Sequence, residues 1–286
     1  TFEPIVQIVA RPNVIGSNSL VNIDAQSLVF DDTNLFSWNK YSGYDRFETG
    51  VRANYGAQFT LNFNNGGFIN VMAGQSYQLA GKNSYSTPDA ANVGLASGLD
   101  TRRSDYVGRI ALAPAGSLSF VAKARWEQAN MHRRRLDPVA GAAFGPLTGT
   151  IQYANYSAQQ LLGFDVRRQG LSLGARYDIT KNYFVNGNVQ FDMSRYLYNN
   201  TAAINGTWGY APVMSVAGLG LGAGYQDDCT TFTINYTSTY QVNSSTGLPG
   251  RNQTLLMSLQ LRTLGEAKVG ASLGFVPQND GLKQAQ

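Results

Sequence analysis

The sequence predicts an all-β fold, an antiparallel outer-membrane β-barrel, with about twelve strands in this chain. Three observations lead to this prediction: long segments of alternating apolar and polar residues, apolar faces without charge, and connections that are alternately short and long. Only 14% of the 286 residues are charged, against roughly 25% in soluble domains. No apolar run approaches the roughly 18 residues of a transmembrane helix. Such a composition is expected when half of each strand faces lipid and half faces water.

The alternation is clearest between residues 212 and 240, which form two segments around a tight turn at 226–228. In the second segment, Phe232, Ile234 and Tyr236 alternate with threonine and asparagine. In the first, one face carries Val213, Ser215, Ala217, Leu219, Leu221, Ala223 and Tyr225, and the other carries Met214, Val216 and glycines 218, 220, 222 and 224. Alternation over more than about ten residues is long for a globular strand and suits a tilted strand that crosses a bilayer.

The same pattern repeats along the chain and defines the expected strands. They are 3–11, 51–63, 68–80, 105–113, 118–127, 133–144, 147–157, 167–179, 183–194, 213–225, 231–240 and 252–263. Turn-forming residues such as Asn64-Asn65-Gly66-Gly67 join them in pairs. The tight turns near 65, 115, 145, 181 and 227 fall at one end, and the long connections near 13–45, 81–102, 159–166, 196–211 and 241–250 fall at the other. This sorting is typical of an outer-membrane barrel with short periplasmic turns.

The apolar faces of five segments carry no charged residue; these segments are 51–63, 118–126, 171–179, 183–193 and 255–261. In residues 51–63 that face consists of Val51, Ala53, Tyr55, Ala57, Phe59, Leu61 and Phe63. A Lys or Arg that faces lipid at the membrane midplane costs roughly 2–4 kcal/mol, so we expect this face to contact lipid. The opposite face is polar, and the residues expected to line the lumen are Asn54, Gln58, Arg125, Asn188 and Gln190. Aromatic residues gather near both strand ends, as in the girdles at the two membrane interfaces.

Residues that could support catalysis or hold a cofactor are few. His132, the only histidine, lies beside an expected outer loop; a solvated loop histidine is the simpler interpretation and a hydrolase base the alternative. The sequence contains no metal-ligand cluster, phosphate-binding glycine loop or nucleophile elbow. The net charge of +4 is spread along the chain and does not indicate a nucleic-acid partner. We therefore expect no enzyme activity and no cofactor.

Arginines recur where a long connection enters a strand. They are Arg102, Arg103, Arg133, Arg134, Arg135, Arg167, Arg168 and Arg251. The guanidinium fork binds phosphate well, and the phosphates at an outer rim would be those of lipopolysaccharide. A generic cationic rim paired with nearby aspartates is the open alternative.

The only cysteine, Cys229, lies at the turn between the segments 213–225 and 231–240. It can be a small buried residue, a free thiol or half of a disulfide. On the expected topology it lies at a periplasmic rim, where disulfides persist, and this favours a partner outside the chain.

Four stretches resemble the C-terminal barrel of the lipopolysaccharide-assembly protein family LptD, also called organic solvent tolerance protein OstA, with the alphaproteobacterial branch most similar. They are SLVFDDTNLFSWNKYSGYDRFETGVRANYG, GQSYQLAGKNSY, SGLDTRRSDYVGR and NQTLLMSLQLRTLG. The resemblance implies a non-enzymatic protein of the Gram-negative outer membrane that inserts lipopolysaccharide into the outer leaflet, with sugars in the lumen and lipid leaving by a lateral seam. The partners it implies are lipopolysaccharide, membrane lipids, an LptE-like lipoprotein plug, and a periplasmic bridge component reached through an N-terminal jellyroll.

The resemblance also assigns individual residues. Residues 252–263 resemble the last barrel strand, so that Thr254, Leu256, Ser258 and Gln260 would belong to the lateral gate. Cys229 matches the cysteine region that is bonded to the N-terminal domain, although the family often has two adjacent cysteines there. Because the chain opens without Met inside an expected strand, we interpret it as the C-terminal half of a larger barrel, with strands over 1–263 and a periplasmic tail over 264–286. A general or substrate-specific porin is the alternative function.

Overall fold

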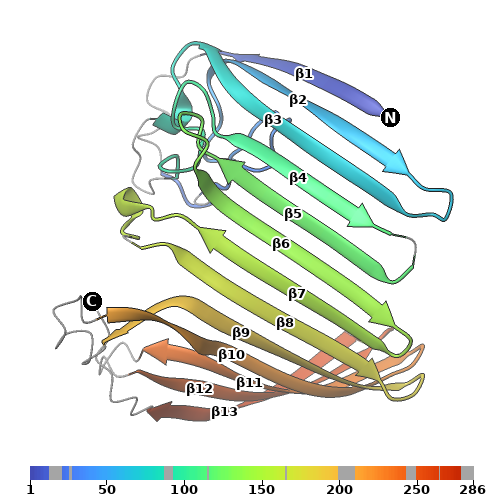
Figure 1. The fold of residues 1–286 in the computed structure, drawn as a ribbon. Coiled ribbons are helices and arrows are strands. Elements are labelled where there is room, and N and C mark those ends of the chain that lie inside the picture. The colour runs from blue at the N-terminus through green and yellow to red at the C-terminus, as the bar shows by residue number, and fades with distance from the viewer. Residues whose placement is uncertain are drawn as a thin grey trace. The chain divides into compact units, whose positions relative to one another are not determined.

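The computed structural model contains one antiparallel sheet of thirteen strands that follow one another in chain order (Figure 1). It describes residues 1–12, 21–25, 28–86, 93–114, 116–164, 166–198, 210–242, 249–263 and 265–277. The strands are β1 (Phe2–Arg11), β2 (Gly50–Asn62), β3 (Phe68–Ala80), β4 (Tyr106–Ala113), β5 (Leu118–Trp126), β6 (Arg133–Phe144), β7 (Leu147–Tyr156), β8 (Arg168–Asp178), β9 (Tyr183–Tyr198), β10 (Tyr210–Gln226), β11 (Thr230–Val242), β12 (Pro249–Leu261) and β13 (Gly265–Pro277). The short 3₁₀ helices η2 (Ser84–Ser86) and η3 (Gln160–Leu162) lie in connections. Among the described residues, no helix has the length and hydropathy needed to cross a membrane.

The expected all-β antiparallel class is confirmed, and all twelve expected strands are present. β3 and β6 have the expected bounds, and the other ten differ from expectation by at most four residues at either end. The turn between β2 and β3 also forms where its sequence predicts it. Phe63 N donates to Gly67 O at 2.7 Å, and Gly66 has a φ of 85°, a conformation that glycine adopts without strain.

The C-terminal end differs from the expectation. In place of a tail over 264–286, residues Gly265–Pro277 form β13, which pairs with β12 along its length. This corrects the assignment of β12 as the last strand, because both of its edges are paired. β13 has a weak apolar signal, since small residues, Ala267 and Ala271, flank Val269 on its apolar face. The rest of the expected tail lies outside the described residues.

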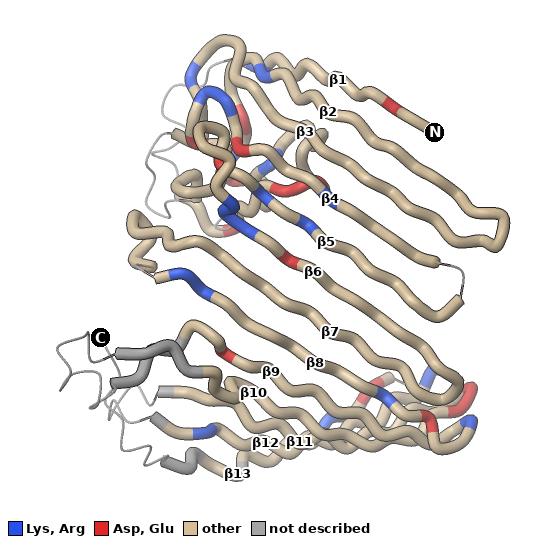
Figure 2. The backbone as a smooth tube through the Cα atoms, in the orientation of Figure 1, with Lys and Arg blue, Asp and Glu red and all other residues tan. Residues whose placement is uncertain are grey.

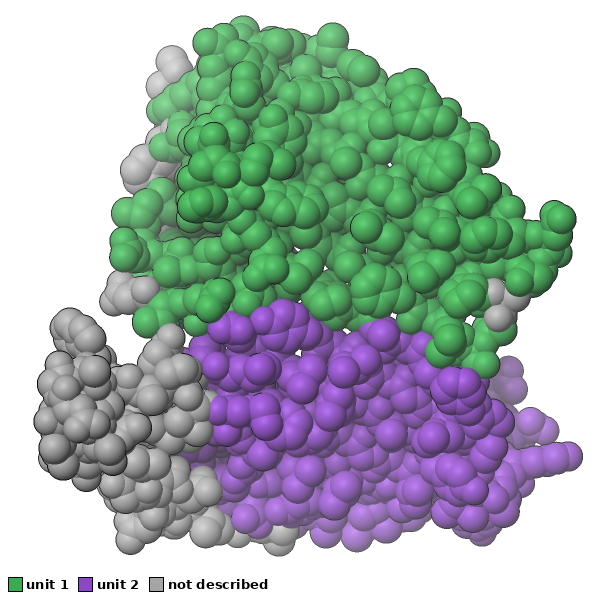
Figure 3. All heavy atoms as spheres, in the orientation of Figure 1, with its two compact units in different colours: residues 1–139, 154–168 green, residues 140–153, 169–286 purple. Residues whose placement is uncertain are grey.

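The chain divides into two compact units, which Figure 3 colours separately. Unit 1 consists of residues 1–139 and 154–168, and unit 2 of residues 140–153 and 169–286. Unit 1 therefore holds β1–β5 with their connections, and unit 2 holds β9–β13. All the buried charged residues found in the described chain lie in unit 1.

Burial in the sheet is inverted relative to a water-soluble protein. On β2, Phe59 and Leu61 are each 44% exposed, whereas Arg52 and Asn54 on the opposite face are 2% and 0% exposed. Figure 2 shows long stretches of strand without any charged residue. An exposed apolar face backed by a buried polar face is the arrangement expected when the apolar face contacts lipid.

Residues 21–25 and 28–49, which we call the first insertion, lie between β1 and β2 and fold onto the polar face of the sheet. Their side chains Phe30 and Leu35 are fully buried in one core with Met72 of β3. Gly74 lies beneath this core: a Cβ there would lie 2.4 Å from Leu35 Cδ2 and 2.6 Å from the Tyr55 carbonyl oxygen. The stretch expected to be a polar loop is thus largely a packed layer that needs a glycine in the strand beneath it.

Residues 81–86 and 93–105, which we call the second insertion, lie between β3 and β4 and join the same core. Tyr85 is 1% exposed, and its ring centroid lies 4.7 Å from that of Tyr41 in the first insertion. The Tyr41 hydroxyl donates to the Ser84 carbonyl oxygen at 3.1 Å, and the Thr49 amide donates to Ser84 Oγ at 2.9 Å. The two insertions therefore stabilise each other.

Candidate functional site

A buried group of charges fixes the first insertion to β2. Lys40 Nζ lies 3.5 Å from Glu48 Oε1, and Arg52 Nε lies 3.2 Å from Glu48 Oε2. The Lys40 ammonium also donates at 3.2 Å to Asn54 Oδ1, which accepts from Ser76 Oγ at 2.6 Å. Burial lowers the pKa of Lys40 to about 8, against the opposing effect of Glu48. Asn54, expected to line the lumen, is therefore covered by the first insertion.

A second ionic group joins the first insertion to β4 and β5. Arg109 Nη1 lies 3.3 Å from Asp32 Oδ2, and Lys123 Nζ lies 3.3 Å from both Asp31 Oδ2 and Asp32 Oδ1. Burial raises the pKa of Asp31, but hydrogen bonds from Thr33 and the charge of Lys123 outweigh burial and lower this pKa below its usual value. The Asp-Asp pair is thus a link between the insertion and the sheet.

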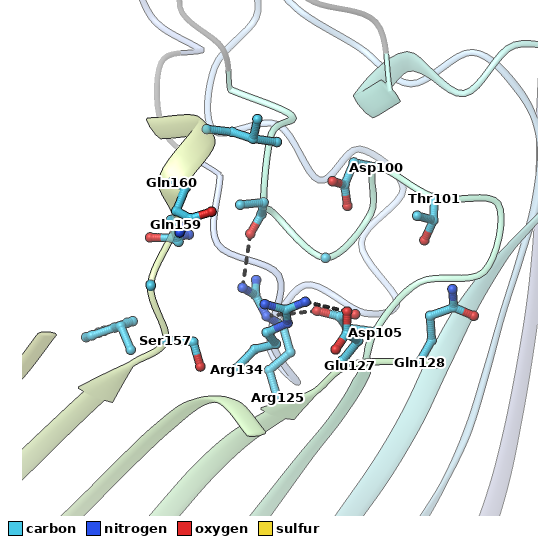
Figure 4. Close-up of a pocket in the computed structure, with 15 residues that line it drawn as sticks. Asp100, Thr101, Asp105, Arg125, Glu127, Gln128, Arg134, Ser157, Gln159 and Gln160 are labelled. Carbon is cyan, nitrogen blue, oxygen red and sulfur yellow. Dashed lines mark hydrogen bonds and ion pairs between the residues drawn. The ribbon is translucent and has the colours of Figure 1, made fainter. Parts of the chain in front are cut away.

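A cavity of about 500 Å³ opens between the second insertion, the β5–β6 turn and the segment that follows β7 (Figure 4). Arg125 of β5, only 8% exposed, donates to the carbonyl oxygens of Ser97 and Ala96. Its Nε lies 3.3 Å from Asp105 Oδ2. Arg134 of β6 forms an ion pair with Glu127 in the same cavity. Both cations of the cavity wall are thus committed to partners within the protein.

The backbone of the cavity wall depends on these contacts. Ala96 and Gly98 have φ values of 54° and 89°, in the left-handed region that favours glycine. A Cβ on Gly98 would lie 2.9 Å from Asp105 Oδ2 and 3.1 Å from Arg125 Cδ, so that a side chain there has no room. Burial raises the pKa of Asp105 to about 6, although Arg125 and Arg134 oppose the shift.

A second cavity, of about 480 Å³, lies beside the first. Asp100 lines both cavities, and Gln78, Asn83 and Arg102 line the second. Arg102 Nε donates to the Gln78 carbonyl oxygen at 3.2 Å, so this arginine too is held by the protein. Neither cavity is predictable from the sequence, because the lining residues come from separate segments that share no local motif.

The structure divides the rim arginines into two groups. One group is held by the protein: Arg102 by the carbonyls of Gln78 and Leu79, Arg134 by Glu127, Arg135 by Asp137, Arg168 by Gln159, and Arg251 by Ser238 and the Val216 carbonyl. The other group, Arg103, Arg133 and Arg167, is exposed, and these side chains form no hydrogen bond or ion pair within the described part of the chain. Only the second group consists of guanidinium groups that have no partner in the described part of the chain.

The expected lumen residues of β9 lie across the glycine row of β10. A Cβ on Gly220 would lie 2.2 Å from Asn188 Oδ1, and a Cβ on Gly218 would lie 3.2 Å from Gln190 Oε1. The glycines thus make room for amide side chains of the neighbouring strand. Asn188 and Gln190 are exposed, Gln58 on β2 is half-buried, and the lumen set is not one continuous site.

The remaining expected residues lie apart from the cavities. Cys229 is an exposed free thiol in the β10–β11 turn, where its amide donates to Asp227 Oδ1 at 2.9 Å, and its disulfide stays a prediction. His132 is exposed in the β5–β6 turn. The expected gate residues Thr254, Leu256, Ser258 and Gln260 lie along β12, where Ser258 Oγ donates to Glu266 Oε1 of β13 at 3.0 Å. Within the described ranges, no group of three or more His, Cys, Asp or Glu side chains could hold a metal ion.

Comparison with known proteins gives one family match. Residues 1–137 match the model of the family described as LptD, LPS transport system D. The matched part contains β1–β5 and both insertions, and it supports LptD family membership, a role in lipopolysaccharide transport or assembly, and an outer-membrane location. No curated protein matches the chain. The solved structures that it resembles include Salmonella typhi OmpF in complex with daunomycin, at 11% identity and a TM-score of 0.38, covering 84% of this chain and 87% of that chain. A likeness this weak carries no argument about function.

Proposed function

We propose that this chain is the C-terminal part of an LptD-type protein that inserts lipopolysaccharide into the outer leaflet of a Gram-negative outer membrane. The observation that carries the proposal is the family match over residues 1–137. This segment also builds both insertions and most of the lining of both cavities. The family is one of transport and assembly, so the proposed role is non-catalytic. Membership of the alphaproteobacterial branch belongs to the same proposal.

The two faces of the sheet have different partners in this function. Exposed apolar residues such as Phe59 and Leu221 contact membrane lipid, where a charged side chain would be costly. On the other face, the exposed amides Asn188 and Gln190 offer hydrogen bonds to sugars in the lumen. One face of the wall thus suits the surrounding membrane and the other suits the sugar portion of the substrate.

The exposed arginines suit the phosphates of lipopolysaccharide. Arg103, Arg133 and Arg167 have uncommitted guanidinium groups, whose planar donors bind phosphate in a bidentate manner. Arginines 102, 134, 135, 168 and 251 are structural, since each already has a partner within the protein. The proposed phosphate-binding residues are therefore three of the eight rim arginines, Arg103, Arg133 and Arg167.

The partners follow from the family resemblance. The β12–β13 hairpin, which contains Thr254, Leu256, Ser258 and Gln260, borders the lateral seam through which the lipid leaves. An LptE-like lipoprotein fills the lumen of the complete barrel, and a periplasmic bridge component delivers lipopolysaccharide through an N-terminal jellyroll. Cys229 is bonded to that N-terminal region.

The test replaces the three exposed arginines in the intact protein, in a strain whose surface lipopolysaccharide depends on it. The triple variant Arg103→Ala, Arg133→Ala, Arg167→Ala should reduce lipopolysaccharide in the outer leaflet by about tenfold or more, because each lost pair removes charge-assisted hydrogen bonds. Arg176→Ala is the matched control, since this arginine is 41% exposed and pairs with Asp178. The readout is modification of surface lipopolysaccharide by an added enzyme that cannot enter the cell.

Two outcomes contradict the proposal at different levels. Normal surface lipopolysaccharide in the triple variant refutes the phosphate assignment. If depletion of the whole protein leaves surface lipopolysaccharide unchanged, while the purified protein conducts ions steadily, the protein is a porin and the proposed function is wrong.

A further inference from the structure

We infer that the two cavities that share Asp100 form a binding site for an uncharged, hydroxyl-rich stretch of oligosaccharide. The inference rests on the proposed function, since it names the part of the substrate that this site would hold. Three properties of the cavities lead to it: the state of their charges, the polar groups left without partners, and their size.

The charges of the first cavity are already neutralised. Arg125 is engaged by Asp105 and by two backbone carbonyls, and Arg134 is engaged by Glu127. A phosphate would have to displace one of these carboxylates, and Asp100 adds a further negative charge to the lining. The cavity therefore differs from the exposed rim arginines and disfavours an anion.

The polar groups that remain free are acceptors and amides. The side chains of Asp100, Gln128 and Gln160 line the first cavity, and none of them hydrogen-bonds to a residue in the described ranges. Figure 4 shows them around the opening, from the second insertion, the β5–β6 turn and η3. A carboxylate accepts hydrogen bonds, whereas an amide both donates and accepts. Sugar hydroxyls also donate and accept, so they can satisfy all three groups at once.

The size of the site indicates several sugar units. The two cavities have volumes of about 500 Å³ and 480 Å³, each within the roughly 300–1,000 Å³ of small-molecule sites. Because Asp100 lines both, one carboxylate can contact consecutive parts of an extended ligand. Gln78 and Asn83 continue the polar lining into the second cavity.

The site is held in one conformation before any ligand arrives. Arg125 fixes the carbonyls of Ala96 and Ser97, the amide of Asp105 donates to the Gly98 carbonyl at 2.8 Å, and Asn83 Nδ2 donates to the Leu99 carbonyl at 2.8 Å. These bonds tie the loop that carries Asp100 to β5 and to the rest of the second insertion. A prearranged site loses less conformational entropy on binding a flexible saccharide.

The experiment measures binding of a lipid-free, dephosphorylated core oligosaccharide to the intact protein in detergent, by calorimetry. We expect saturable binding that weakens about tenfold in Asp100→Ala and in Gln160→Ala, because each change removes a hydrogen-bonding group from the cavity. Gln226→Ala, which removes an exposed amide at the end of β10, is the control and should bind like wild type. Inorganic phosphate, added as a separate probe, should not compete.

Absence of binding to wild type overturns the inference, as does wild-type affinity in both cavity variants or competition by phosphate. Heat-dependent gel mobility confirms that each variant is folded. Surface lipopolysaccharide is measured in the same strains, so the two ideas can fail separately. If surface lipopolysaccharide depends on the protein but the oligosaccharide does not bind, only the saccharide site is wrong; if it does not depend on the protein, the proposed function is wrong.

Discussion

Replacing Glu48 by Gln tests the buried charge group that holds the first insertion. The side chains of Lys40, Glu48 and Arg52 are 0%, 6% and 3% exposed, so the change leaves two buried cations without a carboxylate. Removing one partner of a buried ion pair costs about 3–5 kcal/mol of unfolding free energy. The contribution of Lys40 to this cost is limited, because its pKa is about 8 and it can become neutral. At pH 7 the folded protein can release that proton for about 1.4 kcal/mol.

Arg52 cannot lose its charge in this way, since a guanidinium stays protonated in proteins. In the variant, Arg52 would keep its hydrogen bond to Asn83 Oδ1, at 3.0 Å, and its cation–π contact with the Tyr85 ring, 5.2 Å from Cζ. These contacts partly compensate for the lost carboxylate. We therefore expect Glu48→Gln to lower the free energy of unfolding by about 3 kcal/mol at pH 7, with about half of this loss from Lys40.

The contribution of Lys40 also makes the stability depend on pH. Its pKa is lowered in the folded state, so the folded protein releases this proton before the unfolded chain does, and wild-type stability rises with pH from about 8 toward 10.5. At about pH 9 Lys40 is mostly neutral in both folded proteins. The difference between Glu48→Gln and wild type should then shrink by about 1.4 kcal/mol.

The free energy of unfolding is measured at pH 7 and pH 9 by urea unfolding of the protein in lipid vesicles. Unfolding is followed by tryptophan fluorescence and gel mobility. Asp178→Asn is the control, because the Arg176–Asp178 pair is 41% and 42% exposed and such a pair contributes at most about 1 kcal/mol. A loss below about 1 kcal/mol for Glu48→Gln, or an equal loss at pH 7 and pH 9, refutes the reasoning.

Three further changes test the cavity wall and the lipid-facing surface. Gly98→Ala should lower the urea midpoint more than Gly116→Ala, because both glycines have positive φ but only Gly98 has atoms within 4 Å of an added Cβ; equal midpoints would contradict this contact. The folded Asp105 carboxyl holds its proton more tightly than the unfolded one, so the stability of wild type should fall as the pH rises from 3.8 to about 6. Asp105→Asn should not show this fall. A titration that shows the same slope in the variant would assign that slope to another group. Leu221→Lys should cost about 2–4 kcal/mol of folding free energy in vesicles, because it places a charge on the lipid-facing side. Gln190→Lys, on the polar side, should cost much less. Similar losses in the two variants would show that the two faces do not differ in environment.

The strands were predictable because their signal is local. Alternation over 68–80 and the turn at 64–67 depend on neighbours in sequence, and both were found as expected. The faces were predictable for the same reason: Arg52 and Tyr55 lie on opposite sides of β2, one buried and one 40% exposed. β13 was missed because it begins with Gly265 and Glu266, directly after an expected strand end.

The insertions and cavities were not predictable from local pattern. Residues 21–49 look like a polar loop, because the groups that neutralise Asp32 are on strands far along the chain. Arg102 and Arg103 are adjacent and both exposed, yet Arg102 donates to two carbonyls and Arg103 forms no side-chain hydrogen bond or ion pair in the described part of the chain. Such differences arise from tertiary contacts, which a motif of arginines does not encode.

The link between the first insertion and the strands has a consequence for the timing of assembly. Asp31 contacts Lys123, which lies 92 residues later in the chain and is therefore translated later. The insertion emerges before β4 and β5 exist, and contacts at this separation form slowly because chain entropy opposes them. Its acidic pair can be neutralised only when these strands are in place. Protease protection of residues 28–49 would thus mark the moment in biogenesis when the first five strands have assembled.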